Sequence, residues 1–287
     1  MRNYVIVTDS SADLSSEMSE ALGLRTIQLG VMVEGEAVQA NNAVDVKAIY
    51  EMLRQKKMAT TSAVNIEQFL EIFEGIVKED LDILYLGFSS GLSGTFSASA
   101  VAMRELSEKY PDRKLYAVDT LCASMGQGLL VYYAAKLKEG GADIDAVKDY
   151  VESNKLNLCH WFTVDDLFFL KRGGRVSAAT AVVGTMLSIK PVMHVDNAGK
   201  LINVSKVRGR KAAVDALFEK TKASAIPGKN DTMFISHGDC IADAEYLAAR
   251  LKNELGVKHV EINYVGPVIG AHSGPGTLAV FYLGNER

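Results

Sequence analysis

Short apolar runs alternate with longer segments of helical periodicity along this chain of 287 residues. Such alternation predicts parallel sheets whose strands are joined by crossover helices, and therefore an α/β fold. In the first half, strands are expected near residues 4–8, 24–29, 82–87 and 114–118, and helices near 15–22, 46–56, 66–79, 95–109, 123–139 and 143–154.

The pattern changes around residue 158. Paired glycines interrupt it in EGGADIDA (139–146), and an aromatic run, WFTVDDLFFLKRGGR, follows. A hairpin-like pair, KPVMHV and KLINVS joined by DNAG, comes next, with two more helix and strand units after it. Because the chain is longer than one typical core, we expect two domains: a Rossmann-like α/β domain over residues 1–155 and a C-terminal α/β domain over 156–287.

Composition narrows the class of protein. Hydrophobic residues make up 48% and charged residues 23%, as in ordinary soluble globular proteins. The net charge of -4 argues against general nucleic-acid binding. Three scattered cysteines without a C-x-x-C pair, and no apolar run of membrane-spanning or signal-peptide type, predict a cytoplasmic protein.

Several expected strands run into small, hydroxyl-rich turns: VIVTDSSAD, YLGFSSGLSGT, YAVDTLCAS and FISHGDC. Each turn alone is explained by helix capping. In an open parallel sheet, however, such turns gather at the carboxyl edge, where ligands bind. Together they therefore indicate a site whose hydroxyls and amides converge on an anion.

Known anion and catalytic motifs fit poorly. Residues 87–100, GFSSGLSGTFSASA, contain no lysine for a phosphate loop and no G-x-G-x-x-G. GLSGT lacks the last glycine of a nucleophile elbow, G-x-S-x-G. Ser93 with His272 as base leaves an ester or thioester hydrolase as an alternative, although no carboxylate to orient the histidine is evident.

The histidines do not form a metal-binding pattern. There is no H-E-x-x-H, and His237, Asp239 and Cys240 lie within one turn, where they cannot all face one ion. His160 and His194 are expected to be structural.

Two segments are strongly basic: KLINVSKVRGRK (200–211) and LKRGGRV. They form either solvated surface or a docking surface for an acidic protein or an anionic membrane.

A set of segments, in order and spacing, resembles the DegV family of bacterial fatty-acid-binding proteins. The segments are IVTDSSADLS, TTSAVNIEQFLEIFE, LGFSSGLSGTFSASAVA, AVDTLCASMGQG, LKRGGRVSAATAVVGTMLSIKPVMHVDNAGKL, KVRGRKAA and VGPVIGAHSGPGTLAVFYLG. The resemblance implies two α/β domains with one long-chain fatty acid between them. It also implies a carrier without catalytic activity, metal or cofactor, which presents the fatty acid to a fatty acid kinase subunit that makes acyl phosphate for phospholipid synthesis.

Carried over by position, the resemblance places the carboxylate at Thr61 and Ser93, with Ser62 and Gly94 beside them and His272 closing the site. Arg208 would lie near the head group or on the kinase-docking surface. Where many relatives have Gln-Pro after the Thr-Ser pair, this chain has Ala63-Val64, which leaves the aim of Thr61 open.

Elementary chemistry agrees with a carboxylate in this loop. A carboxylate only accepts hydrogen bonds, so hydroxyls and amides can satisfy it without a permanent positive partner. Burying each methylene contributes about 0.8 kcal/mol, so an acyl tail would supply most of the binding free energy. Residues expected to be available for a tunnel are Phe162, Leu167, Phe168, Leu170, Met186, Leu187 and Ile189.

Overall fold

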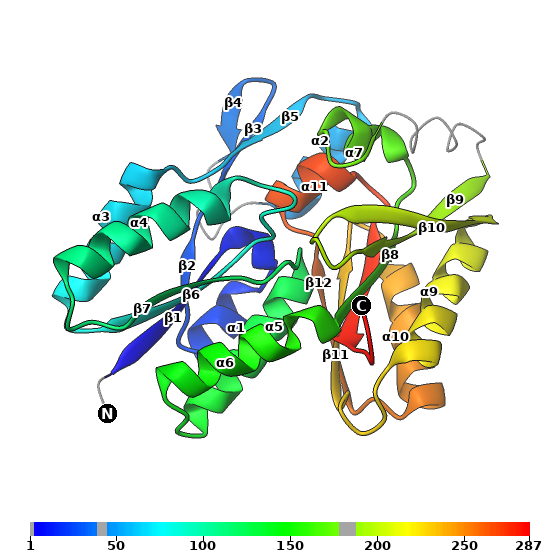
Figure 1. The fold of residues 1–287 in the computed structure, drawn as a ribbon. Helices are drawn as coiled ribbons and strands as arrows, with labels where there is room; N and C mark the ends of the chain where they lie inside the picture. Colours follow the sequence, from blue (N-terminus) through cyan, green and yellow to red (C-terminus); the bar gives the residue numbers. More distant parts are fainter. Residues whose placement is uncertain (1–2, 39–44, 178–187) are drawn as a thin grey trace.

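The computed structural model describes residues 3–38, 45–177 and 188–287, and its first part forms a parallel sheet of four strands (Figure 1). The strand order is β2-β1-β6-β7, and every neighbouring pair is parallel. The polar turns after β1, β6 and β7 therefore lie at one edge, as the sequence predicts. The strands are β1 (Tyr4–Asp9), β2 (Arg25–Ile27), β6 (Asp82–Gly87) and β7 (Leu115–Asp119).

Helices cover both faces of this sheet because its strands are apolar on both sides. On β1, Val5 and Val7 belong to the core under one pair of helices, whereas Tyr4 and Ile6 belong to the core under another pair. The first pair of helices is α3 (Ile66–Lys78) and α4 (Thr95–Lys109), and the second is α5 (Met125–Glu139) and α6 (Ile144–Asn154).

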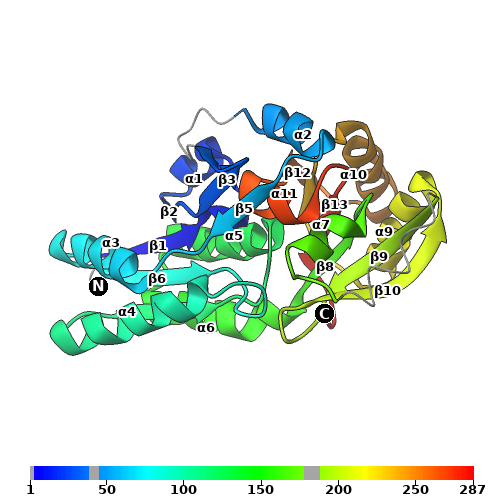
Figure 2. The same ribbon diagram turned by 90° about the horizontal axis from the view of Figure 1, so that it is seen from above.

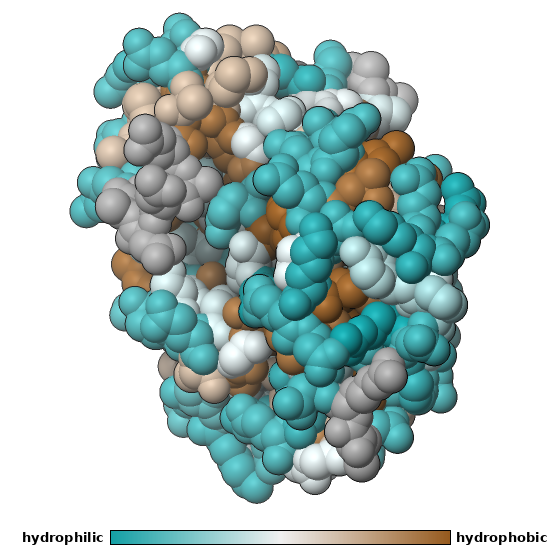
Figure 3. All heavy atoms as spheres, turned by 90° about the vertical axis from the view of Figure 1, so that its left-hand side faces the viewer, coloured by the Kyte–Doolittle hydropathy of each residue, from teal (hydrophilic) through white to brown (hydrophobic). Residues whose placement is uncertain are grey.

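The surface seen in Figure 3, the left-hand side of Figure 1, is mainly hydrophilic with separate apolar patches.

The second sheet has six strands in the order β10-β9-β8-β13-β11-β12. It is mixed: only the β11–β12 pair is parallel, and the other pairs are antiparallel. The predicted hairpin forms its edge, since β9 pairs with β10. Its elements are β8 (Leu158–Thr163), β9 (Ile189–Val195), β10 (Leu201–Arg208), α9 (Arg210–Ser224), β11 (Thr232–His237), α10 (Ile241–Leu255), β12 (His259–Tyr264) and β13 (Leu278–Leu283).

Helix α5 lies between the two sheets. Residues from Met125 to Val131 are buried without interruption, as expected for a helix that is covered on all sides. Its core includes Leu86 of β6 and Phe281 of β13, so the same helix packs on both sheets. The two parts of the chain therefore share one hydrophobic core, and the opposite face of the second sheet is covered by α9 and α10.

A third, small sheet joins the two parts on another side. Its strands are short and antiparallel, in the order β4-β3-β5, and β5 lies beside α11 from the end of the chain (Figure 2). Tyr50 of α2 fixes this arrangement by donating to the carbonyl of Val265, 2.7 Å away. The elements are β3 (Gly30–Val33), β4 (Glu36–Val38), α2 (Val46–Arg54), β5 (Ala59–Ser62) and α11 (Pro267–Ser273).

The β9–β10 turn closes a further contact with the first part of the chain. Ser89, in the polar turn after β6, donates to the carbonyl of Gly199 at 2.8 Å. Gly199 has φ of +70°, and a Cβ there would lie 2.1 Å from the Ser89 hydroxyl, so both the backbone and the space require glycine. The DNAG turn is thus shaped to dock on the Ser-Gly loop.

The structure confirms the α/β fold and the elements expected in the first half, with ends that agree within about two residues. It corrects two points. The second sheet is mostly antiparallel, and the small sheet β3–β5 was not predicted because three- and four-residue strands carry little periodicity. The division near residue 155 stays a prediction. The remaining described elements are η1 (Ser10–Ala12), α1 (Ser16–Ala21), η2 (Lys155–Asn157) and α7 (Leu167–Arg172).

Within the described ranges, no helix is long and apolar enough to cross a membrane.

Candidate ligand-binding site

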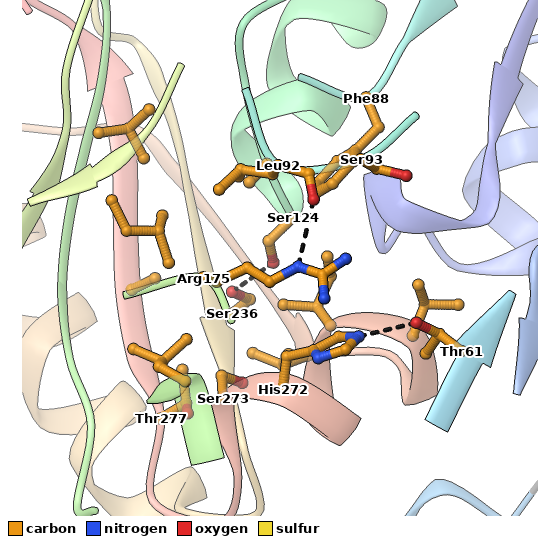
Figure 4. Close-up of a pocket in the computed structure, with 18 of the residues that line it drawn as sticks. Thr61, Phe88, Leu92, Ser93, Ser124, Arg175, Ser236, His272, Ser273 and Thr277 are labelled. Atoms are coloured by element: carbon orange, nitrogen blue, oxygen red, sulfur yellow. Dashed lines mark hydrogen bonds between the residues drawn. The ribbon is translucent and has the colours of Figure 1, made fainter. Parts of the chain in front are cut away.

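A cavity of about 300 Å³ lies between the two large sheets, bordered by the small sheet and α11 (Figure 4). Residues from both parts of the chain line it, and most of them are apolar. The lining residues are Leu29, Thr61, Ser62, Ala63, Phe88, Leu92, Ser93, Gly94, Ala123, Ser124, His160, Phe162, Leu170, Arg175, Val195, Leu201, Ser236, Val265, Val268, Ile269, His272, Ser273, Thr277, Ala279 and Phe281.

One face of the six-stranded sheet forms a wall of this cavity. Side chains alternate along a strand, so His160 and Phe162 of β8 point to the same side. Their register partners on β13, Phe281 and Ala279, also line the cavity. The wall is mostly apolar but includes Ser236 of β11, the register partner of Ala279, and His160, whose Nε2 accepts from the amide of Ala123 at 3.2 Å. Burial lowers the pKa of His160 well below its ordinary value, so this histidine is a neutral structural residue.

The most direct link across the cavity joins Thr61 and His272. Thr61 Oγ1 on β5 lies 2.7 Å from His272 Nε2 on α11, although 211 positions separate them in the sequence. The small sheet holds Thr61 in place, and Val64 is buried in the core behind it. The Ala63-Val64 departure thus leaves Thr61 directed at His272.

The double glycine of LKRGGRV makes room for the imidazole. A Cβ on Gly173 would lie 2.3 Å from His272 Nδ1, closer than side chains approach one another. Gly173 ends α7 with φ of -73°, which any residue can adopt, so the contact and not the backbone favours glycine here. Helices α7 and α11 are therefore in close contact at the histidine.

Burial and nearby positive charge keep His272 neutral. Burial is the main cause and the guanidinium groups of Arg175 and Arg172 add to it, lowering the pKa of His272 from 6.5 to about 4. A neutral imidazole both donates and accepts one hydrogen bond, so it can share a proton with the Thr61 hydroxyl.

Arg175 is the charged residue that the sequence reasoning missed. Its Nε donates to the carbonyl of Leu92 at 3.2 Å (Figure 4). A second nitrogen donates to the carbonyl of Gly173. Burial lowers the pKa of this guanidinium, which nevertheless remains a cation. The lining of the cavity therefore contains a permanent positive charge in addition to the hydroxyls.

Ser93, Ser62 and Gly94 all line the cavity, and their contact with a carboxylate stays a prediction. The Ser93 hydroxyl, however, pairs with Thr95 Oγ1 at 2.9 Å at the start of α4, and it is turned away from His272 (Figure 4). Gly94 is the N-cap residue of α4, so its backbone rather than a side chain faces the cavity.

Arg208 lies apart from the residues of the head-group cluster. It lies at the exposed end of β10 and does not line the cavity. Of the expected tunnel residues, Phe162 and Leu170 line the cavity, whereas Leu167 packs in the core and Phe168 is 56% exposed. Ile189 lies outside the lining, and Met186 and Leu187 fall outside the described residues.

The geometry does not assemble a hydrolase triad from the described residues. Ser93 and His272 hydrogen-bond to different threonines, and no described carboxylate bonds to the His272 ring. In the same part of the chain, no group of three His, Cys, Asp or Glu side chains could hold a metal ion.

Fold and site together define a two-domain α/β protein with an apolar cavity that ends in a cluster of hydroxyl, imidazole and guanidinium groups. The DegV family model, described as "Uncharacterised protein, DegV family", matches residues 3–285. The chain belongs to the DegV family.

Relatives match over the whole length. A DegV domain-containing protein of Clostridium perfringens is 46% identical over 289 residues, covering 100% of this chain and 99% of the relative. The chain is also similar to a solved structure whose subject is fatty acid binding of a DegV family protein from Thermus thermophilus, with a TM-score of 0.87, 28% identity and coverage of 99% and 100%. A third match is DegV of Bacillus subtilis, described as a fatty acid binding protein, with a TM-score of 0.83, 28% identity and the same coverage.

Proposed function

We propose that this protein binds one long-chain fatty acid in the cavity between its sheets, with the carboxylate at the Thr61–His272 pair. The observation that carries the proposal is a mostly apolar cavity with hydroxyl, imidazole and guanidinium groups gathered at the Thr61–His272 pair. A volume of about 300 Å³ is at the small end of the range for ligand sites. The relatives described as fatty-acid-binding proteins support the same ligand class.

The head-group chemistry follows from the donors. With Nε2 protonated, His272 donates to Thr61 Oγ1, and the Thr61 hydroxyl proton is then free to bond a carboxylate oxygen. Arg175 adds a charge of opposite sign, and Ser62 is a further donor in the lining. The Ser93 hydroxyl would have to turn from Thr95 Oγ1 to reach the ligand. A charge-assisted hydrogen bond contributes about 1.5–3 kcal/mol, so the polar cluster fixes orientation while the tail supplies most of the affinity.

The protein's role is to carry and present this fatty acid rather than to transform it. A kinase subunit would phosphorylate the bound carboxylate, and the acyl phosphate would enter phospholipid synthesis. The resemblance to the family suggests this role, and the exposed basic strand β10, with Lys206 and Arg208, supports it as a surface for an acidic partner. The same charges suit a transient contact with an anionic membrane in the cytoplasm.

The test is identification of the ligand and measurement of its retention. Native mass spectrometry of the purified protein, followed by solvent extraction, should find one fatty acid per chain. In delipidated protein, Thr61→Val combined with Ser93→Ala should weaken binding of a long-chain fatty acid about tenfold or more.

Ser107→Ala is the matched control, because the Ser107 hydroxyl bonds to Met103 O within α4 and does not line the cavity. Unchanged retention in the double variant would overturn the head-group assignment. A protein that is purified empty and takes up no fatty acid would overturn the proposed function itself.

A further inference from the structure

Hydroxyl groups also line the cavity away from the Thr61–His272 pair. They belong to Ser124, Ser236, Ser273 and Thr277, and all four residues are buried. In Figure 4, Ser273 and Thr277 lie on the opposite side of His272 from Thr61. A hydroxyl buried against a plain hydrocarbon chain is unfavourable unless it has a hydrogen-bond partner. We therefore asked where each of these hydroxyls finds its partner.

Ser273 has none within the described part of the chain. It is the last residue of α11, its residue exposure is 4%, and its Oγ is buried without a hydrogen bond. Of the buried side-chain atoms that lack a partner in the described ranges, it is the one that lines this cavity. Thr277, by contrast, donates to the carbonyl of Gly274 at 2.8 Å. Because nearly all buried polar atoms are paired, the free Ser273 hydroxyl points to a partner that comes with the ligand.

Ser236 stands at the end of a short hydrogen-bond chain. Ser124 Oγ donates to Asp13 at 2.5 Å, and it lies 2.9 Å from Ser236 Oγ (Figure 4). The Ser236 proton then bonds to Ser124, which leaves the lone pairs of Ser236 Oγ open to a donor in the cavity. Burial also raises the pKa of Asp13 to about 8, so this acid can carry a proton and reverse the direction of the chain. Ser236 can thus accept a hydrogen bond or donate one.

The residue that carries this hydroxyl, Ser124, has an unusual backbone conformation. Its φ of 53° and ψ of -147° lie in a region that residues with a Cβ rarely adopt. Such conformations persist where the surrounding structure requires them and gather at functional sites. In this conformation the Ser124 hydroxyl bonds to Asp13 and Ser236.

We propose that the cavity selects an acyl chain that carries a hydroxyl group along its length, with Ser236 and Ser273 as the hydrogen-bond partners of that hydroxyl. The inference rests on the proposed binding of fatty acids and adds a substrate class to it. A hydroxyl both donates and accepts, as these two serines do, so it would satisfy the free Ser273 oxygen that an unsubstituted chain leaves unpaired.

The experiment compares stearic acid with its monohydroxy isomers, substituted at successive mid-chain positions, on delipidated full-length protein. At least one isomer should bind about threefold or more tightly than stearic acid. Ser273→Ala should strengthen the binding of stearic acid and weaken the binding of that isomer. The preference for the isomer, measured as the ratio of the two dissociation constants, should therefore fall about tenfold. Ser236→Ala should also lower this preference, and Ser107→Ala should leave it unchanged.

The outcomes separate the two proposals. If stearic acid binds and no hydroxy isomer binds more tightly than it does, the hydroxyl preference is wrong while fatty-acid binding stands. A ratio that neither serine variant moves also overturns the preference. If neither stearic acid nor any isomer binds, the proposed function fails, and this inference fails with it. Should Ser236→Ala unfold, Ser273→Ala decides the question, because the Ser273 hydroxyl makes no bond that the described fold needs.

Discussion

Gly173 lies directly against His272, with room for no side chain between α7 and the imidazole. The contact joins the double-glycine segment to the helix near the end of the chain, and it sets where the ring can stand relative to Thr61. Its importance can be tested by adding a single methyl group.

Gly173→Ala should displace the His272 ring and weaken fatty-acid binding about tenfold, because the added Cβ would lie 2.3 Å from Nδ1. Isothermal titration of delipidated protein measures the effect. Gly75→Ala is the control: a Cβ on this α3 glycine meets nothing within 4 Å, so it should bind normally and be slightly more stable. Equal affinities for the two variants would show that the ring position does not matter.

His272 should make stability depend on pH. Its pKa in the folded protein is about 4 against an ordinary 6.5, so the unfolded chain binds the proton more tightly. The neutral His272 therefore makes its full contribution to the free energy of unfolding above pH 6.5. As pH falls from 6.5 toward 4, the free energy of unfolding decreases by up to about 3 kcal/mol.

His272→Gln removes this titration. The difference in free energy of unfolding between wild type and variant, from urea denaturation, should shrink between pH 7 and pH 4.5. His259→Gln, at an exposed position on β12, provides the comparison. A difference that is the same at both pH values would argue against a neutral, buried His272.

Asp13 should make stability depend on pH in the opposite direction to His272. Burial raises its pKa from 3.8 to about 8, so the folded protein holds this proton more tightly than the unfolded chain. Its stabilising contribution is complete below pH 3.8 and is lost as pH rises toward 8.

Asp13→Asn is neutral at every pH, and asparagine tolerates the φ of 53° at this position. The stability of the variant relative to wild type should therefore increase by about 1–3 kcal/mol between pH 5 and pH 7. Thermal or urea unfolding at both pH values checks this, and a relative stability that does not change with pH would contradict the assignment.

Arg208→Glu should separate delivery from binding. Because Arg208 is exposed and does not line the cavity, the dissociation constant for the fatty acid should stay within about twofold. The rate of phosphorylation by a fatty acid kinase subunit should fall about tenfold, since reversing a charge on a docking surface slows association. Lys222→Glu, an equal charge change at an exposed position of α9, is the control. Equal loss of binding and phosphorylation would place Arg208 in the pocket.

The sequence was informative where a pattern is local. The start of α3 is an example: the side chain of Asn65 accepts from the Gln68 amide in a capping box, and the Asn and Gln three positions apart are a local signal for it. The small sheet and the mixed order of the second sheet depend on pairings between distant segments, which periodicity does not report. Thr61 and His272 were named through the family resemblance, and the structure places them in contact.

Arg175 shows the limit of that reasoning. LKRGGRV was interpreted as surface charge, because a basic run is normally solvated. Only the tertiary structure, in which Arg175 donates to the carbonyl of Leu92, shows that one of its three cations faces the cavity. A signal was present nonetheless, since the adjacent glycines already indicated a close approach of some other group.

The bond between Thr61 and His272 also has a consequence for folding. The two residues are 211 positions apart in the sequence, so their contact closes a very long loop. Contacts of such high sequence separation cost the most chain entropy to form. A chain in which the small sheet has formed but α11 has not yet docked therefore lacks half of this pair, and the head-group site is complete only when the fold is complete.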